Sequence, residues 1–468
     1  MTGPRKRGPL TGSRKRGPLT GSRKRGPLTG PRKRGPLSIV LHTHMPYVEG
    51  FGTWPFGEEW LWEAIATSYL PLLDVLDDHP GRVTLSLTPV LCDQLEAPGA
   101  LDRCLAFLRE IRPASHALDL EAADDAVAAS LERSAATYAA AADALERRGD
   151  LLAAFAPHVS WTSAATHAVL PLLATGTGVR LQLRTGIAAH RERFGEWEGG
   201  FWLPECAHAA WLDDTLEEAG VRVACVDWTD VLGPGPHAAR VTQAGVVLAP
   251  LDREAIELVW HRDGYPSKGA YLDTHRLTER RHRAWAVDGS VYDPGRGAEQ
   301  AAADAEDFVA RVADRGGRSV VAFDTELLGH FWPEGVGWLR AVLEACERRG
   351  LELAPPGAGP AEPAPAVSRP TSWGEGRDLR TWSAPPAGGL AWVQREAELR
   401  AFAGGERPSD RALRELLALQ SSDWAFLLSA GTAGDYPRER AEGHRAGFEA
   451  ALADPAMAAA VRHLAPLL

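Results

Sequence analysis

Short apolar runs recur along the chain, separated by stretches in which apolar residues return every three or four positions. Such runs, bounded by polar or turn residues, predict buried strands. We expect strands at residues 37–41, 83–87, 201–203, 221–226, 246–249, 256–259 and 319–323. The clearest amphipathic helices among them are residues 58–73, 301–315 and 336–349. Strands that alternate with helices favour a parallel sheet covered by helices.

Other regions depart from this alternation. Residues 101–112 and 122–148 are rich in Ala, Leu and charged residues at helical spacing, which predicts a helical insertion at about 98–155,. Residues 353–370 are rich in Pro, Ala and Gly, which is typical of a linker between residues 38–352 and a C-terminal helical domain, residues 371–468,. The helices expected in that domain are residues 391–401, 411–419, 425–428, 437–453 and 456–463.

Residues 2–37 are four copies of the nonamer Thr-Gly-Pro/Ser-Arg-Lys-Arg-Gly-Pro-Leu. Gly, Pro and clustered like charge cannot bury a core, so we expect a disordered basic tail and a fold that begins near Ser38. A basic repeat can bind polyanions. A repeat expansion or an over-extended start site would explain it equally well.

The net charge is −11, and residues 2–37 hold twelve Lys and Arg and no acid, so the remainder carries −11 minus 12, or −23. Such an acidic body is not expected to bind nucleic acid through its folded surface. No apolar stretch reaches the roughly 18 residues of a membrane span, and the N-terminus lacks a secretory apolar segment. The expectation is a cytoplasmic protein that binds no membrane, with oligomeric state left open.

Scattered cysteines without CxxC spacing argue against a disulfide framework and a zinc cluster, and favour free buried thiols. They are Cys92, Cys104, Cys206, Cys225 and Cys346. Cys206 follows Glu205 directly and is a candidate nucleophile, although a carboxylate at a strand end is the better one.

Three apolar runs end directly in ionisable side chains. The run 39–41 is followed by His42-Thr43-His44, the run 201–203 by Pro204 and Glu205, and the run 319–323 by Asp324. Catalytic groups of a β/α barrel lie at the carboxyl ends of its strands. We therefore expect these groups to converge on one site.

These stretches resemble the conserved motifs of glycoside hydrolase family 57, and most closely those of its 1,4-α-glucan branching enzymes. Further matching stretches follow in order at residues 53–61, 86–91, 165–167, 259–260, 371–375 and 421–424. The resemblance covers residues 38 to 468. It implies an α/β fold: an incomplete, seven-stranded (β/α) barrel with a helical insertion and a C-terminal helical domain that lends residues to the site.

The resemblance makes Glu205 the nucleophile and Asp324 the general acid/base of a retaining mechanism, in which two carboxyl groups stand about 5–5.5 Å apart. The two are 119 residues apart in sequence, being residues 205 and 324. Apolar surroundings such as Phe331 and Trp332 are expected to raise the pKa of the acid. Glu326 is the local rival, because strand alternation would place it on the same face as Asp324 if the strand continued.

The histidines allow two interpretations. An HxH at the end of the first barrel strand also opens metal-dependent amidohydrolases, for which His167 and Asp324 could supply further ligands. The resemblance instead makes His42, His44 and His167 hydrogen-bond donors to the sugar, with no metal and no cofactor. A lone His such as His167 is as often a satisfied core residue.

Sixteen tryptophans are present, and indole packs well against the C–H faces of sugars. The resemblance assigns glucan contact to Trp54, Trp60, Trp260, Trp373 and Trp382, and adds Asp423 from the helical domain. Trp62, Trp202 and Trp338 are expected in the core, and Trp424 is left open.

By resemblance the activity is cleavage of an α-1,4-glucan and transfer of the chain to a 6-hydroxyl, with amylose or a glycogen-like glucan as partner. A hydrolase or 4-α-glucanotransferase on the same site and a non-catalytic glucan-binding protein are alternatives.

One loop departs from the family. Its branching enzymes cover the site with a long, tyrosine-bearing loop, whereas the corresponding residues 228–245 are a short stretch that contains no Tyr. Trp228 or His237 could substitute. The short loop predicts a raised hydrolytic side reaction.

Overall fold

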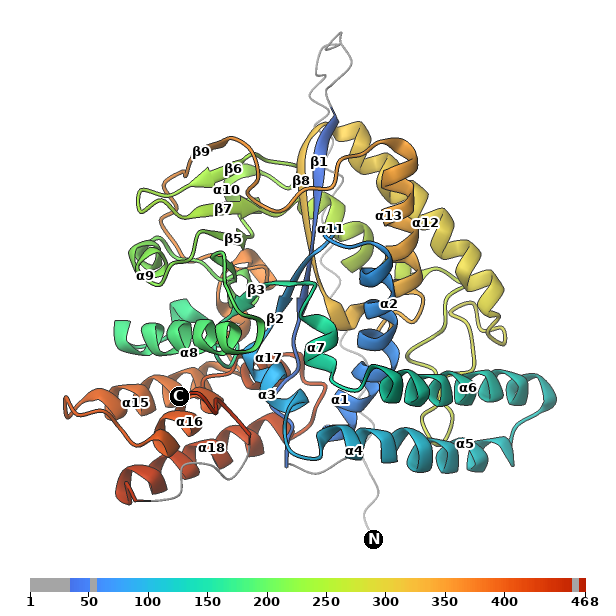
Figure 1. The fold of residues 1–468 in the computed structure, drawn as a ribbon, viewed down its shortest axis with the longest axis horizontal. Coiled ribbons are helices and arrows are strands. Elements are labelled where there is room, and N and C mark those ends of the chain that lie inside the picture. Colours follow the sequence, from blue (N-terminus) through green and yellow to red (C-terminus); the bar gives the residue numbers. More distant parts are fainter. Residues whose placement is uncertain (1–33, 51–56, 457–462) are drawn as a thin grey trace. The chain divides into compact units, whose positions relative to one another are not determined.

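The computed structural model describes residues 34–50, 57–456 and 463–468, and residues 34–468 form one compact unit (Figure 1). The predicted glucan-binding Trp54, the repeats up to Lys33 and most of the expected helix at 456–463 lie outside the described residues. The first strand begins at Arg34, earlier than the apolar pattern indicated, and Leu37 in it is fully buried.

A curled nine-stranded sheet has the order β8-β1-β2-β3-β4-β5-β7-β6-β9. The strands from β8 to β7 in that order pair in parallel, which confirms the incomplete seven-stranded barrel. These strands are β8 (Gly317–Asp324), β1 (Arg34–Thr43), β2 (Thr84–Leu87), β3 (Val159–Ser163), β4 (Gly200–Trp202), β5 (Val223–Val226) and β7 (Val247–Pro250). No ladder pairs β7 with β8 in the described chain; Asp252, just after β7, donates its N–H to the Val320 carbonyl of β8 at 2.8 Å.

Two short strands extend the sheet beyond β7. Strand β6 (Ala239–Val241) pairs antiparallel with β7, and β9 (Ala361–Pro363) pairs parallel with β6. Part of the segment predicted as a linker is therefore hydrogen-bonded to the sheet. The domain boundaries proposed from the sequence remain a prediction.

Helices cover the sheet between successive strands (Figure 1). They are α1 (Glu58–Ala64) and α2 (Leu70–Asp78), joined by a π-helical turn, α3 (Pro89–Leu95), α8 (Gly176–Phe194), α9 (Asp213–Glu218), α10 (Thr229–Leu232), α11 (Arg253–Trp260), α12 (Pro294–Arg315) and α13 (Gly335–Arg349). Between β2 and β3 the chain forms α4 (Ala100–Ala106), α5 (Arg112–Leu120), α6 (Asp125–Arg148) and α7 (Leu151–Phe155), where α5 and α6 pack side by side. The C-terminal helices are α14 (Arg380–Ser383), α15 (Gly388–Phe402), α16 (Asp410–Leu419), α17 (Ser422–Ala430) and α18 (Tyr436–Ala453).

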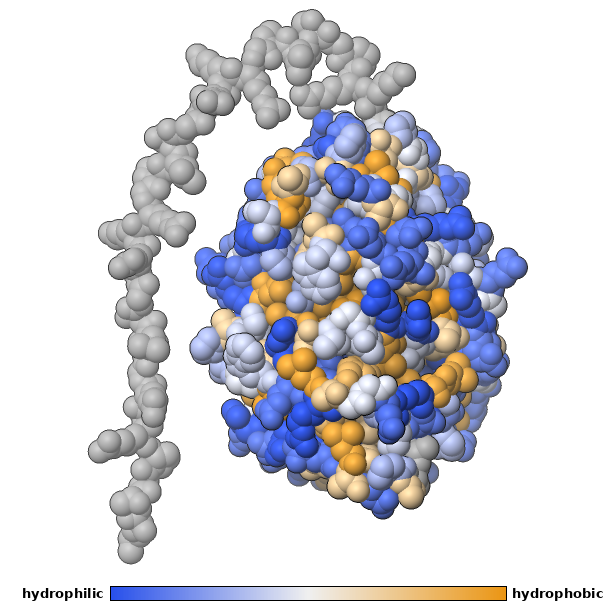
Figure 2. Space-filling view, turned by 90° about the vertical axis from the view of Figure 1, so that its left-hand side faces the viewer, coloured by the Kyte–Doolittle hydropathy of each residue, from blue (hydrophilic) through white to orange (hydrophobic). Residues whose placement is uncertain are grey.

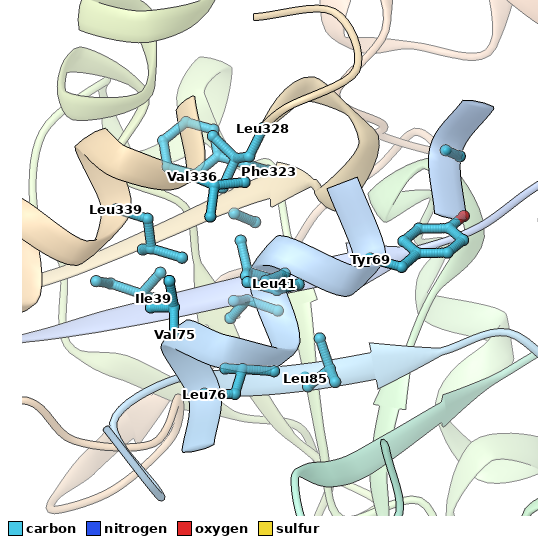
Figure 3. Packing of buried hydrophobic residues seen from close by; sticks show 14 of the residues in the cluster. Ile39, Leu41, Tyr69, Val75, Leu76, Leu85, Phe323, Leu328, Val336 and Leu339 are labelled. Carbon is cyan, nitrogen blue, oxygen red and sulfur yellow. The ribbon is translucent and has the colours of Figure 1, made fainter. Parts of the chain in front are cut away.

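Successive side chains of β1 point alternately into the hydrophobic core and toward the candidate active site. Ile39 and Leu41 point away from the barrel axis into an apolar cluster with α2 and α13, because successive strand residues face opposite sides. Figure 3 shows this packing. The labelled residues of this cluster include Val75 and Leu76 of α2, Leu85 of β2, Phe323 of β8, and Val336 and Leu339 of α13. His42, one residue on from Leu41, faces the other side.

One strand prediction was wrong, and one strand of the barrel was not predicted. Residues 256–259 belong to helix α11, which begins after the cap residue Asp252, whose carboxylate accepts the Ala255 N–H. Ala255, Ile256 and Val259 are its buried residues, a helical spacing that a four-residue window does not reveal,. Strand β3 was missed because its sequence, Val-Ser-Trp-Thr-Ser, is largely polar. Its two buried hydroxyls are satisfied inside the protein: Thr162 donates to the Gly186 carbonyl and Ser163 to that of Trp202.

The surface shown in Figure 2 mixes hydrophilic residues with smaller apolar groups. Among the helices of the described residues, none combines the length and apolar character needed to cross a membrane. All five cysteines are buried and unpaired, as the spacing predicted.

Candidate active site

The predicted functional groups gather where β1, β2, β4 and β8 end. His42 stands opposite Asp324 in the β1–β8 register and opposite Ser86 in the β1–β2 register. Parallel strands deliver their carboxyl ends to one edge of the sheet. The convergence expected from the three apolar runs therefore holds.

Glu205 lies in a short 3-10 turn directly after β4. Its φ of 62° and the φ of 49° at Cys206 are in the left-handed region, which non-glycine residues adopt at a cost,. The Trp373 N–H donates to the Glu205 carbonyl at 3.0 Å, and His208 and Thr371 exchange backbone hydrogen bonds. The segment after β9 therefore holds the turn in this conformation.

The carboxylate of Glu205 accepts two hydrogen bonds from the C-terminal part of the chain. Trp373 Nε1 donates to Oε2 at 2.8 Å, and Ser422 Oγ donates to Oε1 at 2.9 Å. Burial raises the pKa of Glu205 to about 6, while these two donors limit the rise. The group is therefore ionised at neutral pH and fixed at both oxygens.

Asp324 is the last residue of β8 and has a different environment. Its carboxylate accepts no hydrogen bond from any residue that the structure describes. Burial, then the carboxylates of Glu326 and Glu205, raise the pKa of Asp324 well above its ordinary value. The apolar neighbours expected from sequence do not supply this effect: Phe331 is 52% exposed, and the buried Trp332 packs on Tyr271 and Trp338.

Glu326, the local rival, does not continue the strand. β8 ends at Asp324, and Glu326 lies in a 3-10 turn with 6% of its surface exposed. Its Oε1 accepts from the Tyr69 hydroxyl at 2.6 Å and from the His44 N–H at 3.1 Å. Burial raises the pKa of Glu326 to about 7. It is held against the protein and acts on Asp324 by its charge.

The three histidines stack closely at the same edge. The ring centroids of His42 and His167 are 4.8 Å apart, and those of His44 and His167 are 4.1 Å apart. His42 Nε2 and His167 Nε2 are 2.9 Å apart, and His42 Nδ1 lies 3.3 Å from Ser86 Oγ. Burial, with the neighbouring imidazoles, lowers the pKa values of His42 and His167 well below the ordinary value. Both are therefore neutral.

His44 is paired with Asp423, near the start of α17. Its Nε2 lies 3.0 Å and 3.2 Å from the two Asp423 carboxylate oxygens, and its Nδ1 lies 3.1 Å from Thr88 Oγ1. Burial alone lowers the pKa of His44, but Asp423, by charge and hydrogen bond, raises it overall.

The metal interpretation finds little support in this arrangement. Among the described residues, no group of three or more His, Cys, Asp or Glu is arranged to hold a metal ion. Both ring nitrogens of His42, His44 and His167 lie within hydrogen-bond distance of protein atoms. Cys206 is fully buried, and burial raises the pKa of its thiol well above the ordinary value, which argues against a thiolate nucleophile,.

Aromatic rings flank Glu205. Trp373 packs edge-to-face on Trp260 at 4.8 Å and on the core residue Trp202 at 5.0 Å, and Arg253 lies over Trp260 at 5.5 Å. Trp60 and Trp260 are partly exposed.

Trp382, predicted to touch glucan, is only 2% exposed. It packs so closely on Gly374 that a Cβ there would lie 2.7 Å from its ring, so it supports the Trp373 segment from behind. Trp424 is fully buried and donates Nε1 to the Ala418 carbonyl at 2.8 Å, which makes it a core residue. The core assignment of Trp62, Trp202 and Trp338 is confirmed.

The loop after β5 contains no lid residue of the kind considered. Trp228 is 2% exposed and packs edge-to-face on His208 at 5.7 Å. His237 Nε2 lies 3.1 Å from the Gly233 carbonyl within the same loop. The expectation that either substitutes for a lid tyrosine is therefore wrong in this conformation.

Sequence reasoning missed Ser422, which bonds Glu205, and Tyr69, which bonds Glu326. Ser422 stood inside the quoted stretch 421–424, next to Asp423, so its place in that motif was the available signal. For Tyr69, a residue of the helical turn between α1 and α2, the pattern contained no signal.

An incomplete parallel barrel with two carboxyl groups of different acidity at its strand ends has the arrangement that two-carboxylate, glycoside-processing enzymes use. Models of protein families match residues 161–356 to glycosyl hydrolase family 57 and residues 393–462 to the 1,4-alpha-glucan branching enzyme C-terminal region. The chain is 31% identical over 475 residues to the "probable 1,4-alpha-glucan branching enzyme" of Mycobacterium tuberculosis, covering 87% of this chain and 90% of that one. The chain belongs to glycosyl hydrolase family 57.

Two archaeal proteins extend the comparison. The 1,4-alpha-glucan branching enzyme of Thermococcus kodakarensis is 29% identical over 501 residues, which cover 88% of this chain and 72% of that protein. The crystal structure of the GH57-type branching enzyme from Pyrococcus horikoshii superposes with a TM-score of 0.80 at 29% identity, covering 88% of each chain. The similarity therefore includes the barrel and the C-terminal helices together.

Proposed function

We propose that this protein is a retaining 1,4-α-glucan branching enzyme. The observation that carries the proposal is the contrast between the two strand-end carboxyl groups. Trp373 and Ser422 donate hydrogen bonds to the two oxygens of Glu205, which is ionised at neutral pH with a pKa of about 6. Burial and two facing carboxylates instead raise the pKa of Asp324 well above its ordinary value. The ionised Glu205 suits nucleophilic attack, and the protonated Asp324 suits protonation of a leaving oxygen.

In the first step, a Glu205 oxygen attacks the anomeric carbon of an α-1,4-linked glucose while Asp324 protonates the departing 4-oxygen. The glycosidic bond breaks, and the chain stays on Glu205 as an ester. In the second step, the Asp324 carboxylate takes the proton from a 6-hydroxyl, which attacks the same carbon and releases Glu205. Both displacements balance without a cofactor.

The aromatic side chains support binding of a glucan. Trp260 and Trp373 form an edge-to-face pair beside Glu205, and indole faces suit sugar C–H surfaces. We assign Trp60, Trp260, Trp373, His44 and Asp423 to the substrate region. Direct sugar contact by His42, His167 or Trp382 would require exposing a side chain that is almost fully buried, whereas His44 is partly exposed. A neutral glucan is the proposed partner, and a cytoplasmic location is part of the proposal.

Branching is tested by incubating amylose with the protein, then treating the product with a debranching enzyme and measuring chain lengths. We expect new α-1,6 linkages with wild-type protein and none with Glu205→Gln. Products without α-1,6 linkages would move the assignment to a hydrolase or 4-α-glucanotransferase.

The short loop after β5 predicts appreciable hydrolysis alongside branching, because water and a sugar hydroxyl compete for the same ester on Glu205. The loop is held by contacts with the segment that follows α13: its strand β6 pairs with β9, and Arg369 bonds Asp230 at 2.5 Å. Reducing ends released per α-1,6 linkage measure the competition. A ratio below that of a long-loop relative under the same conditions would contradict this prediction.

A further inference from the structure

We propose that Ser422 is a positioning residue for Glu205 and the last donor of a directed hydrogen-bond chain that runs Ser86–His42–His167–Ser422–Glu205. The inference rests on the proposed role of Glu205 as nucleophile. It gives His42 and His167 a role inside the protein, in place of direct donation to the sugar.

The chain is continuous and buried. Ser86 Oγ lies 3.3 Å from His42 Nδ1, His42 Nε2 lies 2.9 Å from His167 Nε2, and His167 Nδ1 lies 2.8 Å from Ser422 Oγ. Ser422 Oγ lies 2.9 Å from Glu205 Oε1. The exposed fractions of the four donor residues are 0%, 1%, 3% and 3% in this order. Water therefore does not compete for these bonds.

The direction of every bond follows from the ionised carboxylate. An ionised Glu205 only accepts, so Ser422 donates its hydroxyl proton and accepts from a protonated His167 Nδ1. A neutral His167 then has a bare Nε2, which accepts from His42 Nε2–H. A neutral His42 has a bare Nδ1, which accepts from the Ser86 hydroxyl. One tautomer is thereby fixed for each histidine, with all ring nitrogens in use.

The backbone strengthens the link between His167 and Ser422. The Ser422 N–H donates to the His167 carbonyl at 3.1 Å, and Ala168 forms a β-bridge with Ser421. His167 adopts a left-handed φ of 59°, which costs energy and persists where surrounding bonds hold it. These contacts fix the start of α17 against the loop after β3, and thus place the Ser422 hydroxyl on Glu205.

The first test is Ser422→Ala, with kcat/KM on a soluble α-glucan measured across pH. Loss of one donor to a buried carboxylate should lower kcat by about 10- to 100-fold with little change in KM. The missing hydrogen bond should raise the pKa of Glu205. The acidic limb of the pH–rate profile, where activity is lost as Glu205 becomes protonated, should therefore move upward by about one pH unit. Unchanged kcat and an unmoved limb would overturn the proposal.

Other ionisable groups face Glu205, and the variant leaves them in place. They are Asp423 of α17, His44 after β1, Asp324 at the end of β8, and His167. Ser422→Ala retains the His44–Asp423 contact. A limb caused by His44 would therefore not move with this substitution.

Two matched variants separate positioning from general damage to α17. Ser422→Thr keeps the hydroxyl and should recover most of the rate and the original limb. Ser429→Ala makes the same change on the same helix, where Ser429 donates to the Thr381 carbonyl at 2.5 Å, and should leave both unchanged. Failure of threonine to rescue a folded protein would count against the hydroxyl's role.

The second test reads the tautomers directly. Histidine ¹⁵N NMR at about pH 8, roughly two units above the pKa of Glu205 of about 6,, should show His42 protonated at Nε2 and His167 protonated at Nδ1. Signals are assigned by loss in His42→Asn and His167→Asn. The opposite tautomers, or a charged ring, would refute the chain.

A double-mutant cycle tests the coupling along the chain. Ser86→Ala should reduce kcat less than Ser422→Ala, and the double variant should lose less than the product of the two factors. Additive losses would mean that the two ends of the chain are independent.

Failure of this inference can be told apart from failure of the proposed function. If Glu205→Gln keeps activity, the proposed function fails, but the histidine tautomers measured by NMR still test the hydrogen-bond chain. If Glu205→Gln is inactive and the limb does not move in Ser422→Ala, only this inference fails.

Discussion

The end of β4 and the end of β8 each present one carboxyl group to the same edge of the barrel, but their surroundings differ. Glu205, after β4, accepts hydrogen bonds from Trp373 and Ser422, both from beyond residue 370. Asp324, at the end of β8, faces the carboxylates of Glu326 and Glu205. Donors stabilise the charged form, whereas burial and like charge disfavour it. The surroundings thus give two chemically similar groups different acidities, which suit the opposite tasks proposed for them.

The comparison also shows what the C-terminal helices contribute. The barrel supplies both carboxyl groups, but the donors that keep Glu205 ionised come from the Trp373 segment and from α17. Asp423 of α17 further pairs with His44. The C-terminal region therefore tunes one carboxylate selectively, and the tests below are arranged by expected size of effect.

The largest effects should come from removing either carboxylate. Glu205→Gln and Asp324→Asn should each lower kcat by about 10²-fold or more on glucan. An activated substrate whose leaving group needs no proton should separate the two, because Asp324→Asn should still form the glycosyl-enzyme and Glu205→Gln should not. Burst kinetics measure this step.

The control for these variants is Glu375→Gln, which alters an exposed carboxyl group just beyond Trp373. It should retain wild-type rate, and all three variants should keep the wild-type melting temperature. If the activated substrate restored formation of the glycosyl-enzyme equally in Glu205→Gln and Asp324→Asn, the assigned roles would be wrong.

The pH profile of kcat/KM should be bell-shaped. Glu205 must be ionised, so the rate should fall by about tenfold per unit below its pKa of about 6,. Asp324 must be protonated, so the rate should also fall as pH rises through its elevated pKa. The limbs are properties of the coupled pair. An acidic limb near the ordinary Glu value of about 4.3 would mean that burial does not control Glu205.

Trp373→Phe should test the comparison from one side, because it weakens the hydrogen bonding of Glu205, after β4, and leaves the surroundings of Asp324 unchanged. It keeps a ring but removes the Nε1–H bonded to Glu205 at 2.8 Å. We expect a loss of about tenfold in kcat and an acidic limb at higher pH, with the alkaline limb nearly unmoved. Trp197→Phe removes a similar bond, to the Gly200 carbonyl at the start of β4, and should leave the profile unchanged.

The smallest effect is expected on the β8 side, from Tyr69→Phe. The Tyr69 hydroxyl lowers the pKa of Glu326, so its loss should favour neutral Glu326 and weaken the repulsion on Asp324. The pKa of Asp324 should then fall, moving the alkaline limb down by roughly half a pH unit. Tyr271→Phe, which removes a 2.6 Å bond to Asp304 away from this edge, is the control. An upward shift would contradict the electrostatic argument.

The sequence by itself determined the strands that carry the reacting groups and the kind of group at each end. Apolar runs before His42, Glu205 and Asp324 are local signals, and a parallel barrel brings their ends together. The repeating helical periodicity also placed α13 within one residue at each end and the C-terminal end of α12 at Arg315, whereas α12 begins seven residues before the predicted start, at Pro294 instead of residue 301. These features depend on neighbours in sequence, so a pattern of hydrophobic positions can express them.

The tertiary structure alone decided which polar side chains satisfy one another. β3 is largely polar because its hydroxyls find partners on neighbouring strands and helices, and residues 256–259 became helix because an Asp252 cap precedes them. Ser422 meets Glu205 across 217 residues, and Tyr69 meets Glu326 across 257. Hydrogen bonds and charge repulsion act through space over a few ångströms. The acidity of each carboxyl group was therefore set by contacts through space, which a pattern of hydrophobic positions does not express.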